Sequence, residues 1–243
     1  MARKAARSKA RSAPAVSPPP ADTPRAKIIE AFMTLLAEQP IEKIGFADIA
    51  ERAGVTLAEL RGEFGSTLAI LAAQVKDLDR QVLAGGDADM GEEDPRERLF
   101  DVLMRRLEML APHKEAVRSL MRSARTNPPL ALALNTMTVR SQQWMLTAAG
   151  IHASGPKGMV RAQGLAVLFA NVLRTWVDDD DDQTKTLAAL DSQLAHGQRL
   201  VGLLDDLLRI PAAAFAFRDR LRSARRSRRD RDRDDDYDDR VAI

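Results

Sequence analysis

The chain has 243 residues, a formal net charge of +2, 45% hydrophobic and 4% aromatic residues, and no cysteine. The lack of cysteine excludes disulfides, thiol nucleophiles and Cys-ligated metals, and no uninterrupted apolar run of about 18 residues exists to cross a membrane. A core built mostly of Leu, Ala, Val and Met favours helices over strands.

Charge is distributed unevenly along the chain. Residues 1–25 hold six cations against Asp22, residues 218–240 hold ten Arg against eight Asp, and residues 26–217 carry the remaining −5. We predict a disordered basic tail over residues 1–22 and a charged low-complexity tail over residues 212–243. Such a basic tail can bind phosphates or another anionic surface.

The first helix is predicted from Pro24 to Gln39. Thr23 is suited to cap it and Pro24 to occupy its first position, where a missing N–H does no harm. Pro40 ends the apolar stripe of this helix.

A helix-turn-helix is predicted over residues 45–64. The apolar residues of its first helix recur on one face, and Gly54 can adopt the left-handed conformation that ends a helix. Thr56 and Glu59 have the spacing of a capping box that starts the second helix. The apolar positions in the two helices are Phe46, Ile49, Ala50, Ala53, Leu60 and Phe64. The second helix of such a unit can enter a DNA major groove.

The stretch Asp48–Thr56 (DIAERAGVT), followed by Leu60 and Phe64, resembles the DNA-binding motif of TetR-family transcriptional regulators. The resemblance implies an all-α fold with a three-helix helix-turn-helix domain at 24–83 and a larger helical domain at 94–210. It also implies a cytoplasmic homodimer that binds double-stranded DNA and a small hydrophobic ligand, without a cofactor. The implied DNA-binding residues are Gly45, Arg52, Thr56, Leu57, Glu59, Arg61, Phe64 and Thr67.

The second helix of this motif is acidic for a DNA-binding helix. TetR relatives usually present Thr, Tyr, a further Tyr or His, and Lys where this chain has Glu59, Arg61, Glu63 and Thr67. Arg61 alone is a good partner for phosphate or guanine, and the two carboxylates oppose a phosphate surface. Arg52 and the basic tail can offset part of this repulsion.

We expect nine helices and no strand. After a helix from Ser66 to near Leu83, the glycine-rich acidic stretch 84–93 marks a domain boundary. The later helices are predicted from Asp94 to Pro112 and over 114–123, 130–149, 159–177 and 187–209, the last ended by Pro211.

The apolar residues of the larger domain predict a ligand-binding role. Inward-facing apolar side chains predict a cavity for a hydrophobic or lipid-like molecule, although for any single Met ordinary core packing is the better explanation. These residues are Met104, Leu107, Met121, Met137, Trp144 and Phe169.

The last two helices carry more apolar residues than one core face needs, which predicts that they join a homodimer. The alternative is burial of both helices within one subunit. The competing residues are Leu165, Leu168, Val172, Trp176, Leu194, Val201, Leu204 and Leu208, with Gly164 and Gly197 allowing close approach.

Nothing in the sequence indicates catalysis or a metal site. His113, His152 and His196 are far apart and lack metal-ligand or triad spacing. The run Asp178–Asp182 lacks the spacing of a calcium loop, so we interpret it as a turn that caps the next helix. We therefore expect a protein that is not an enzyme.

A second resemblance supports an alternative function. Trp176, Asp178, Thr186, Leu190, Asp191 and Leu194 are spaced like the C-terminus of coenzyme-Q biosynthesis accessory proteins. Those proteins have a TetR-like fold, have lost DNA binding and hold isoprenoid lipid. Leu187 and Ala189 stand where those proteins carry aromatic residues.

Overall fold

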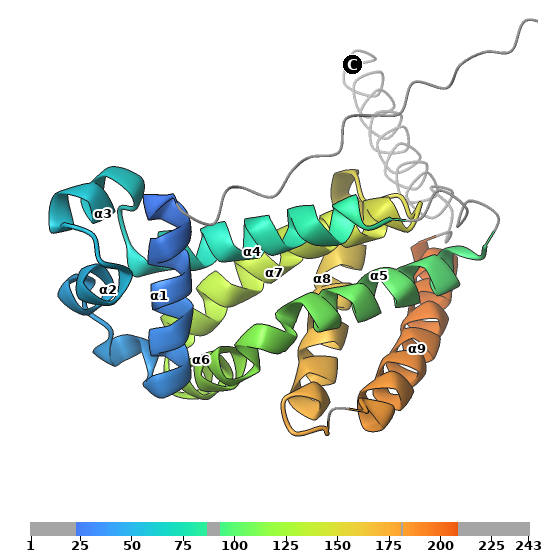
Figure 1. Ribbon diagram of the computed structural model, residues 1–243. Helices are drawn as coiled ribbons and strands as arrows, with labels where there is room; N and C mark the ends of the chain where they lie inside the picture. Colours follow the sequence, from blue (N-terminus) through green and yellow to red (C-terminus); the bar gives the residue numbers. More distant parts are fainter. Residues whose placement is uncertain (1–22, 87–92, 181, 209–243) are drawn as a thin grey trace, which may run out of the picture. The chain divides into compact units, whose positions relative to one another are not determined.

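The computed structural model describes residues 23–86, 93–180 and 182–208, with side chains as far as residue 197. Within these ranges every regular element is helical, which confirms the all-α prediction (Figure 1). The predicted tails, residues 1–22 and 212–243, lie outside the described residues. The helices are α1 (Pro24–Glu38), η1 (Ile41–Lys43), α2 (Phe46–Ala53), α3 (Leu57–Glu63), α4 (Thr67–Ala84), α5 (Pro95–Leu110), η3 (Ala111–His113), α6 (Lys114–Thr126), α7 (Pro128–Ala148), α8 (Gly155–Trp176) and α9 (Thr184–Leu208).

Most helices begin where the sequence predicts, because local side chains cap them. The Ala26 N–H donates to Thr23 Oγ1 at 3.2 Å, and the Leu130 N–H donates to Asn127 Oδ1 at 3.1 Å. Helix α9 starts at Thr184, three residues before the predicted Leu187, and helix α8 starts four residues before the predicted Met159. Pro156 lies in its first turn, where proline fixes a helical φ and needs no hydrogen bond.

Two hydrophobic cores hold the helices together. The N-terminal core comprises the buried apolar faces of α1, α2, α3 and the first half of α4, together with Ala116 of α6 and Leu130 of α7. The body core joins Leu78 and Val82 of α4 to α5, α7, α8 and the start of α9. Because α4 contributes to both cores, the predicted boundary between domains 24–83 and 94–210 stays a prediction. Both cores belong to one compact unit that ends at Leu194, and a second unit begins at Ala195.

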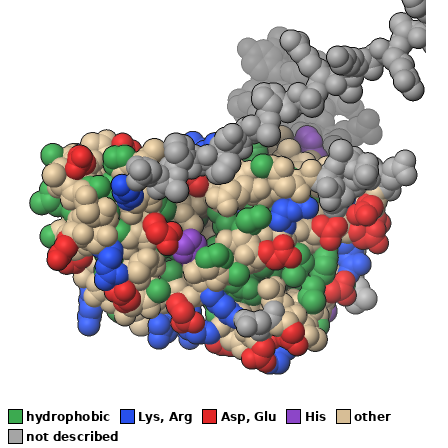
Figure 2. All heavy atoms as spheres, viewed as in Figure 1, with side chains coloured by type: hydrophobic (Ala, Val, Ile, Leu, Met, Phe, Trp, Pro, Cys, Tyr) green, Lys and Arg blue, Asp and Glu red, His purple; other side chains and the backbone are tan. Residues whose placement is uncertain are grey.

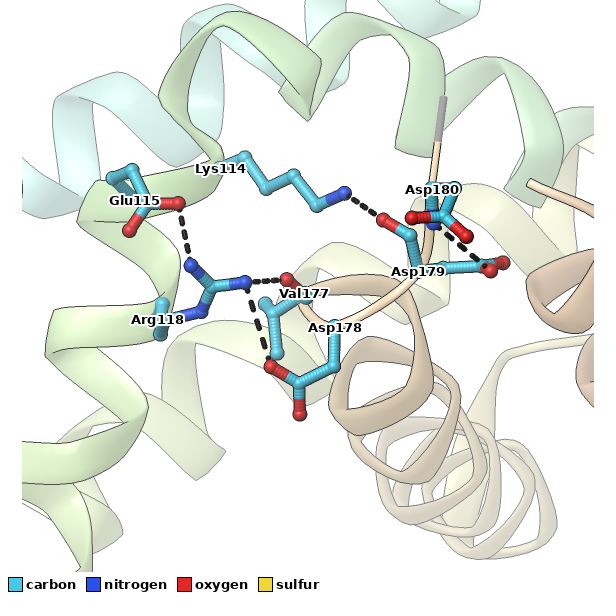
Figure 3. A network of polar contacts seen from close by, with 7 residues as sticks. All are labelled: Lys114, Glu115, Arg118, Val177, Asp178, Asp179 and Asp180. Atoms are coloured by element: carbon cyan, nitrogen blue, oxygen red, sulfur yellow. Dashed lines mark hydrogen bonds and ion pairs between the residues drawn. The ribbon is translucent and has the colours of Figure 1, made fainter. Parts of the chain in front are cut away.

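Helix α6 is tied by charge to the C-terminus of α8 (Figure 3). Lys114 Nζ donates to the Asp179 carbonyl at 2.6 Å, and the Arg118 guanidinium donates to the Val177 carbonyl. Cations at this position stabilise the negative end of the α8 dipole and satisfy carbonyls that have no helical partner.

The predicted role of the Asp178–Asp182 run as a helix cap is confirmed at Asp179. Its Oδ2 accepts from both the N–H and the hydroxyl of Thr186 at 2.7 Å, in the first turn of α9. These hydrogen bonds, the one from the Thr186 side chain above all, lower the pKa of the Asp179 carboxyl below its usual value.

Candidate functional site

The turn between α2 and α3 has the geometry that the sequence predicts. Gly54 has φ +65°, in the left-handed region that favours glycine, and a Cβ at this position would meet no neighbouring atom. The Val55 N–H donates to the Ala50 carbonyl at 3.0 Å, which closes the end of α2. The chain is thus free to change direction and start α3 after three residues.

A complete capping box starts α3. The Thr56 N–H donates to Glu59 Oε2 at 2.7 Å, and the Glu59 N–H donates to Thr56 Oγ1 at 3.2 Å. The hydrogen bonds from the Thr56 backbone and then its hydroxyl lower the pKa of the Glu59 carboxyl. Glu59 therefore stays ionised, and its charge is held against the positive end of α3.

Helix α3 is held against the rest of the molecule by two buried residues, Leu60 and Phe64, which are 2% and 4% exposed. The Arg25 guanidinium lies over the Phe64 ring, with its Cζ 5.0 Å from the ring centroid. The expectation that Phe64 contacts DNA is therefore wrong. Because Phe64 follows Leu60 by one helical turn, it shares the inward face and packs in the N-terminal core.

The outward surface of α2 and α3 includes two exposed apolar residues. Leu57 is 56% exposed, and Phe46 is 44% exposed although the sequence predicts it on the buried face of α2. Phe46 is the first residue of α2, and helical side chains point toward the N-terminus of their helix, so its ring projects beyond the end of the core. Gly45, which caps α2, and Glu59, Arg61 and Glu63 of α3 are also exposed, and Thr67 at the start of α4 is half-buried.

The two arginines predicted to contact DNA differ in their surroundings. Arg52 forms a bidentate ion pair with Glu38 of α1, both N–O distances being 2.8 Å, so its charge is compensated in this structure. The Arg61 guanidinium instead lies beside Gly65, 3.3 Å from the position of a Cβ built on that glycine. Arg61 is therefore placed near the turn between α3 and α4. Figure 2 shows acidic, basic and apolar side chains intermixed at the end of the molecule that holds α2 and α3.

Solved structures share this arrangement of helices. A TetR transcriptional regulator from Nitrosomonas europaea has a TM-score of 0.58 at 21% identity, covering 73% of this chain and 99% of that one. A TetR transcriptional regulator from Rhodococcus sp. RHA1 has a TM-score of 0.53 at 20% identity, covering 72% and 95%. The chain has the TetR fold. No family model and no curated protein matches the sequence itself.

The residues predicted to line a ligand pocket do not lie together: they are divided between the body core, the N-terminal core and the exposed surface. Leu107 and Phe169 are buried in the body core, with Met104 and Met121 packed against it, whereas Met137 packs against the N-terminal core. The prediction for Trp144 is wrong, since its side chain is 56% exposed. The neighbouring Gln142, Met145 and Leu146 occupy the buried face of α7, which turns Trp144 toward solvent.

Two concave regions lie elsewhere in the body. A partly open pocket of about 70 Å³ lies between α4, α5 and the end of α7, and its lining residues are Val82, Leu83, Gly86, Arg98, Val102, Arg105 and Ala148. A more open groove of about 580 Å³ lies between α5 and α9, lined mainly by Glu97, Phe100, Asp101 and Leu187, with the Arg96–Asp191 ion pair at 2.6 Å on its wall.

The described side chains correct the residues expected at the dimer interface. Those of α8 and early α9 are buried within one subunit: Leu165, Leu168, Val172, Trp176 and Leu194. The exposed apolar residues of α8 are instead Met159, Val160 and Val167, and a Cβ on the neighbouring Gly164 would meet nothing. Val201, Leu204 and Leu208 lie outside the described side chains.

Core packing explains the spacing of the residues between Trp176 and Leu194 that resemble the C-terminus of coenzyme-Q biosynthesis accessory proteins. Trp176, Thr186, Leu190 and Leu194 are all buried at the corner between α8 and α9, where Asp179 caps the second helix.

Of the residues that the structure describes, no group of three or more acidic or histidine side chains can hold a metal ion. None of the described helices is long and apolar enough to cross a membrane.

The sequence analysis missed a buried ion pair between Asp79 of α4 and Arg106 of α5. A signal for it exists, because Asp79 continues the apolar stripe between Val75 and Val82, and Arg106 lies beside Leu103 and Leu107 in the stripe of α5. A charged residue within an apolar helical stripe predicts burial beside an opposite charge, but the stripe does not specify which charge that is.

Proposed function

We propose that this chain is a TetR-type transcriptional regulator that binds operator DNA through α2, α3 and the start of α4. The observation that carries the proposal is the presentation of α3, which is capped by Thr56 and Glu59 and anchored by Leu60 and Phe64. Its opposite face, including Leu57 and Arg61, stays exposed. A short rigid helix with one exposed face is what major-groove recognition requires.

The charges of this surface imply that the basic N-terminal residues supply much of the attraction. Arg52 is paired with Glu38, and Glu63 is exposed on α3 without an ion pair that the described residues supply. Arg25 lies over Phe64 at the end of α3, so the first turn of α1 lies close to the recognition helix. Residues 1–22 contain Arg3, Lys4, Arg7, Lys9 and Arg11. A basic arm that starts here can reach phosphates or the minor groove beside the site.

We also propose that the protein acts as a homodimer that buries Met159, Val160 and Val167 of α8. These three residues are each more than half exposed, and Gly164 between them lets a second helix approach closely. Sedimentation should give a dimer for the wild type and a folded monomer for Val167→Glu. Leu132→Glu is the matched control, since Leu132 is 68% exposed on α7. A wild-type monomer at micromolar concentration refutes this assembly.

The proposed ligand is a largely apolar molecule that binds in the body. Met104 and Met121 pack against the body core without being fully buried, and methionine adapts its shape to irregular apolar partners. The two similar solved structures are transcriptional regulators, and they give no support to the alternative of a lipid-binding accessory protein.

A mobility-shift assay tests DNA binding. The upstream region of the chain's own gene is compared with a shuffled fragment of equal composition at two salt concentrations. Wild type should retain the upstream fragment preferentially. Deletion of residues 1–22 should weaken binding and lower the salt slope by about one unit for each lost phosphate contact.

Substitutions at Glu63 separate local charge from net charge. Glu63→Lys should strengthen binding to both fragments, with Glu63→Gln intermediate, because repulsion at the groove is first removed and then replaced by attraction. Glu108→Lys on α5 makes the same charge change at an exposed site away from α3 and should have a smaller effect. If the wild type retains no fragment preferentially and carries co-purified lipid, the regulator is refuted in favour of the lipid-binding alternative.

A further inference from the structure

The polar side chains at the start of α3 are bonded to each other. The Thr56 hydroxyl donates to Glu59 Oε2 at 2.8 Å and accepts from the Glu59 N–H at 3.2 Å. The same carboxylate oxygen accepts from the Thr56 N–H at 2.7 Å. A hydroxyl has one proton to donate, so Thr56 has none left for a base edge, and the Glu59 carboxylate is held back toward the cap.

The side chains that remain at this end of α3 are apolar. Leu57, the first residue of the helix, is 56% exposed, and Ala58 is exposed as well. A single exposed leucine is ordinary on a protein surface, so its position is what matters. In a helix-turn-helix, the N-terminal residues of the second helix contact base edges. Leu57 is therefore the largest side chain that α3 presents to a base at this end.

The outer face of α3 leaves room for DNA to come close. Ala58 and Gly62 stand two residues before and two residues after the buried Leu60, so the helical period places them on the opposite face. A Cβ built on Gly62 would meet no other atom, so packing within the protein does not require this glycine. Because neither residue has a long side chain, the helix can sit deep enough in a groove for Leu57 to reach a base.

Thymine is the base that an apolar side chain can recognise in the major groove. The other groups that the bases present there are hydrogen-bond donors and acceptors, whereas thymine also presents its C5-methyl group. Leu57 can neither donate nor accept a hydrogen bond, so it distinguishes the bases through this methyl group. Removing one such group from water contributes about fourfold in affinity.

Arg61 is placed for a different contact. It follows Leu57 by one helical turn, is exposed, and has no ion-pair partner among the residues that the structure describes. Its guanidinium lies beside Gly65, past the C-terminal end of α3 and away from Leu57. A cation at the end of a recognition helix suits a phosphate, and phosphate contacts position a protein on the duplex without reading its sequence.

We propose that Leu57 determines the base preference of α3 by contacting the C5-methyl group of a thymine, while Arg61 positions the helix through a phosphate. The inference rests on the proposed function, for which it names the base that the operator presents to the start of α3. Base preference and phosphate attraction then belong to different residues, so each can be removed without the other.

DNA with uracil in place of thymine tests the inference, because uracil lacks the C5-methyl group and keeps the same base pairing. The upstream fragment and its shuffled counterpart are each prepared in a thymine form and a uracil form, and mobility shifts give the four affinities. Wild type should bind the thymine form of the upstream fragment about fourfold more tightly than the uracil form. Leu57→Ala should lower this ratio below about twofold. Leu132→Ala, the same change at a 68% exposed leucine of α7, is the matched control and should keep the ratio.

Arg61→Gln separates the two roles. It should weaken binding to both forms by the same factor and lower the salt slope by about one unit, with the ratio unchanged. Leu57→Ala should remain folded, since Leu57 is exposed, and its urea midpoint checks this. Leu57→Gln replaces it if it does not.

A wild-type ratio near one, or an unchanged ratio in Leu57→Ala, overturns the inference. A ratio that falls in Arg61→Gln overturns the assignment of Arg61 to a phosphate. Preferential retention of the upstream fragment without a difference between its two forms refutes only the contact with thymine. Equal binding of the upstream and shuffled fragments in their thymine forms refutes the regulator and the base preference with it.

Discussion

The buried ion pair between Asp79 and Arg106 should be strongly destabilising when only one partner is removed. The side chains of Arg106 and Asp79 are only 5% and 10% exposed, so neither charge can turn to water once its partner is gone. In Arg106→Met the Asp79 carboxylate keeps only the Ser141 hydrogen bond, and in Asp79→Leu the Arg106 guanidinium loses its counter-ion.

Each single substitution should lower the free energy of unfolding by about 3–5 kcal/mol, the usual cost of an uncompensated buried charge. Since a domain of this size loses about 2–4 °C of melting temperature per kcal/mol, the loss corresponds to about 6–20 °C. This is a large share of a total stability of about 5–15 kcal/mol.

Urea denaturation of the two single variants and of the double variant checks the prediction. The double variant should be more stable than either single one, because it leaves no buried charge. Arg52→Met is the matched control: the Arg52–Glu38 pair has similar geometry but side chains 40% and 52% exposed, so its loss should cost less than about 1 kcal/mol.

Two results refute the reasoning. Single variants that lose less than about 1 kcal/mol would mean that water reaches the pair. A double variant as unstable as the sum of the single ones would mean that the side chains contribute by packing and not by charge compensation.

Three further predictions concern local structure. Thr56→Ala should lower the free energy of unfolding by about 1 kcal/mol, measured as a lower urea midpoint, through loss of the α3 cap. Thr136→Ala is the control and should leave the urea midpoint almost unchanged, because the Thr136 hydroxyl bonds only to the Leu132 carbonyl of its own helix. Gly54→Ala should destabilise the folded protein by about 1 kcal/mol, because Gly54 has a φ of +65°. Gly62→Ala within α3, where a Cβ meets nothing, should instead stabilise it. Equal shifts of the urea midpoint in the two variants would contradict the role of the turn. The pKa of Asp179 in the folded state is lowered below 3.8, so its contribution to the free energy of unfolding is complete at neutral pH and is lost as pH falls through that lowered pKa. In urea denaturation from pH 7 to pH 3, the free energy of unfolding of Asp179→Asn should therefore fall less steeply with pH than that of the wild type. Identical slopes for the two proteins would refute this.

Local chemistry along the sequence determined where the helices of this protein begin and turn. Thr23 before Pro24, Gly54 between the helices of the motif, and the Thr56–Glu59 capping box each act over four residues or fewer, so their effect is independent of the rest of the fold. The helical period likewise predicts Leu60 as an anchor of the recognition helix, and its burial agrees.

Tertiary structure alone decided which charges pair and which apolar side chains reach solvent. Glu38 is 14 residues from Arg52, and Asp79 is 27 residues from Arg106 and 62 from Ser141, so packing between helices had to bring each pair together. The exposure of Trp144 and Phe46 was decided in the same way, by where neighbouring helices cover α7 and where α2 extends past the core. Helical periodicity places residues on a common face, but which face is covered depends on contacts that are distant in the sequence.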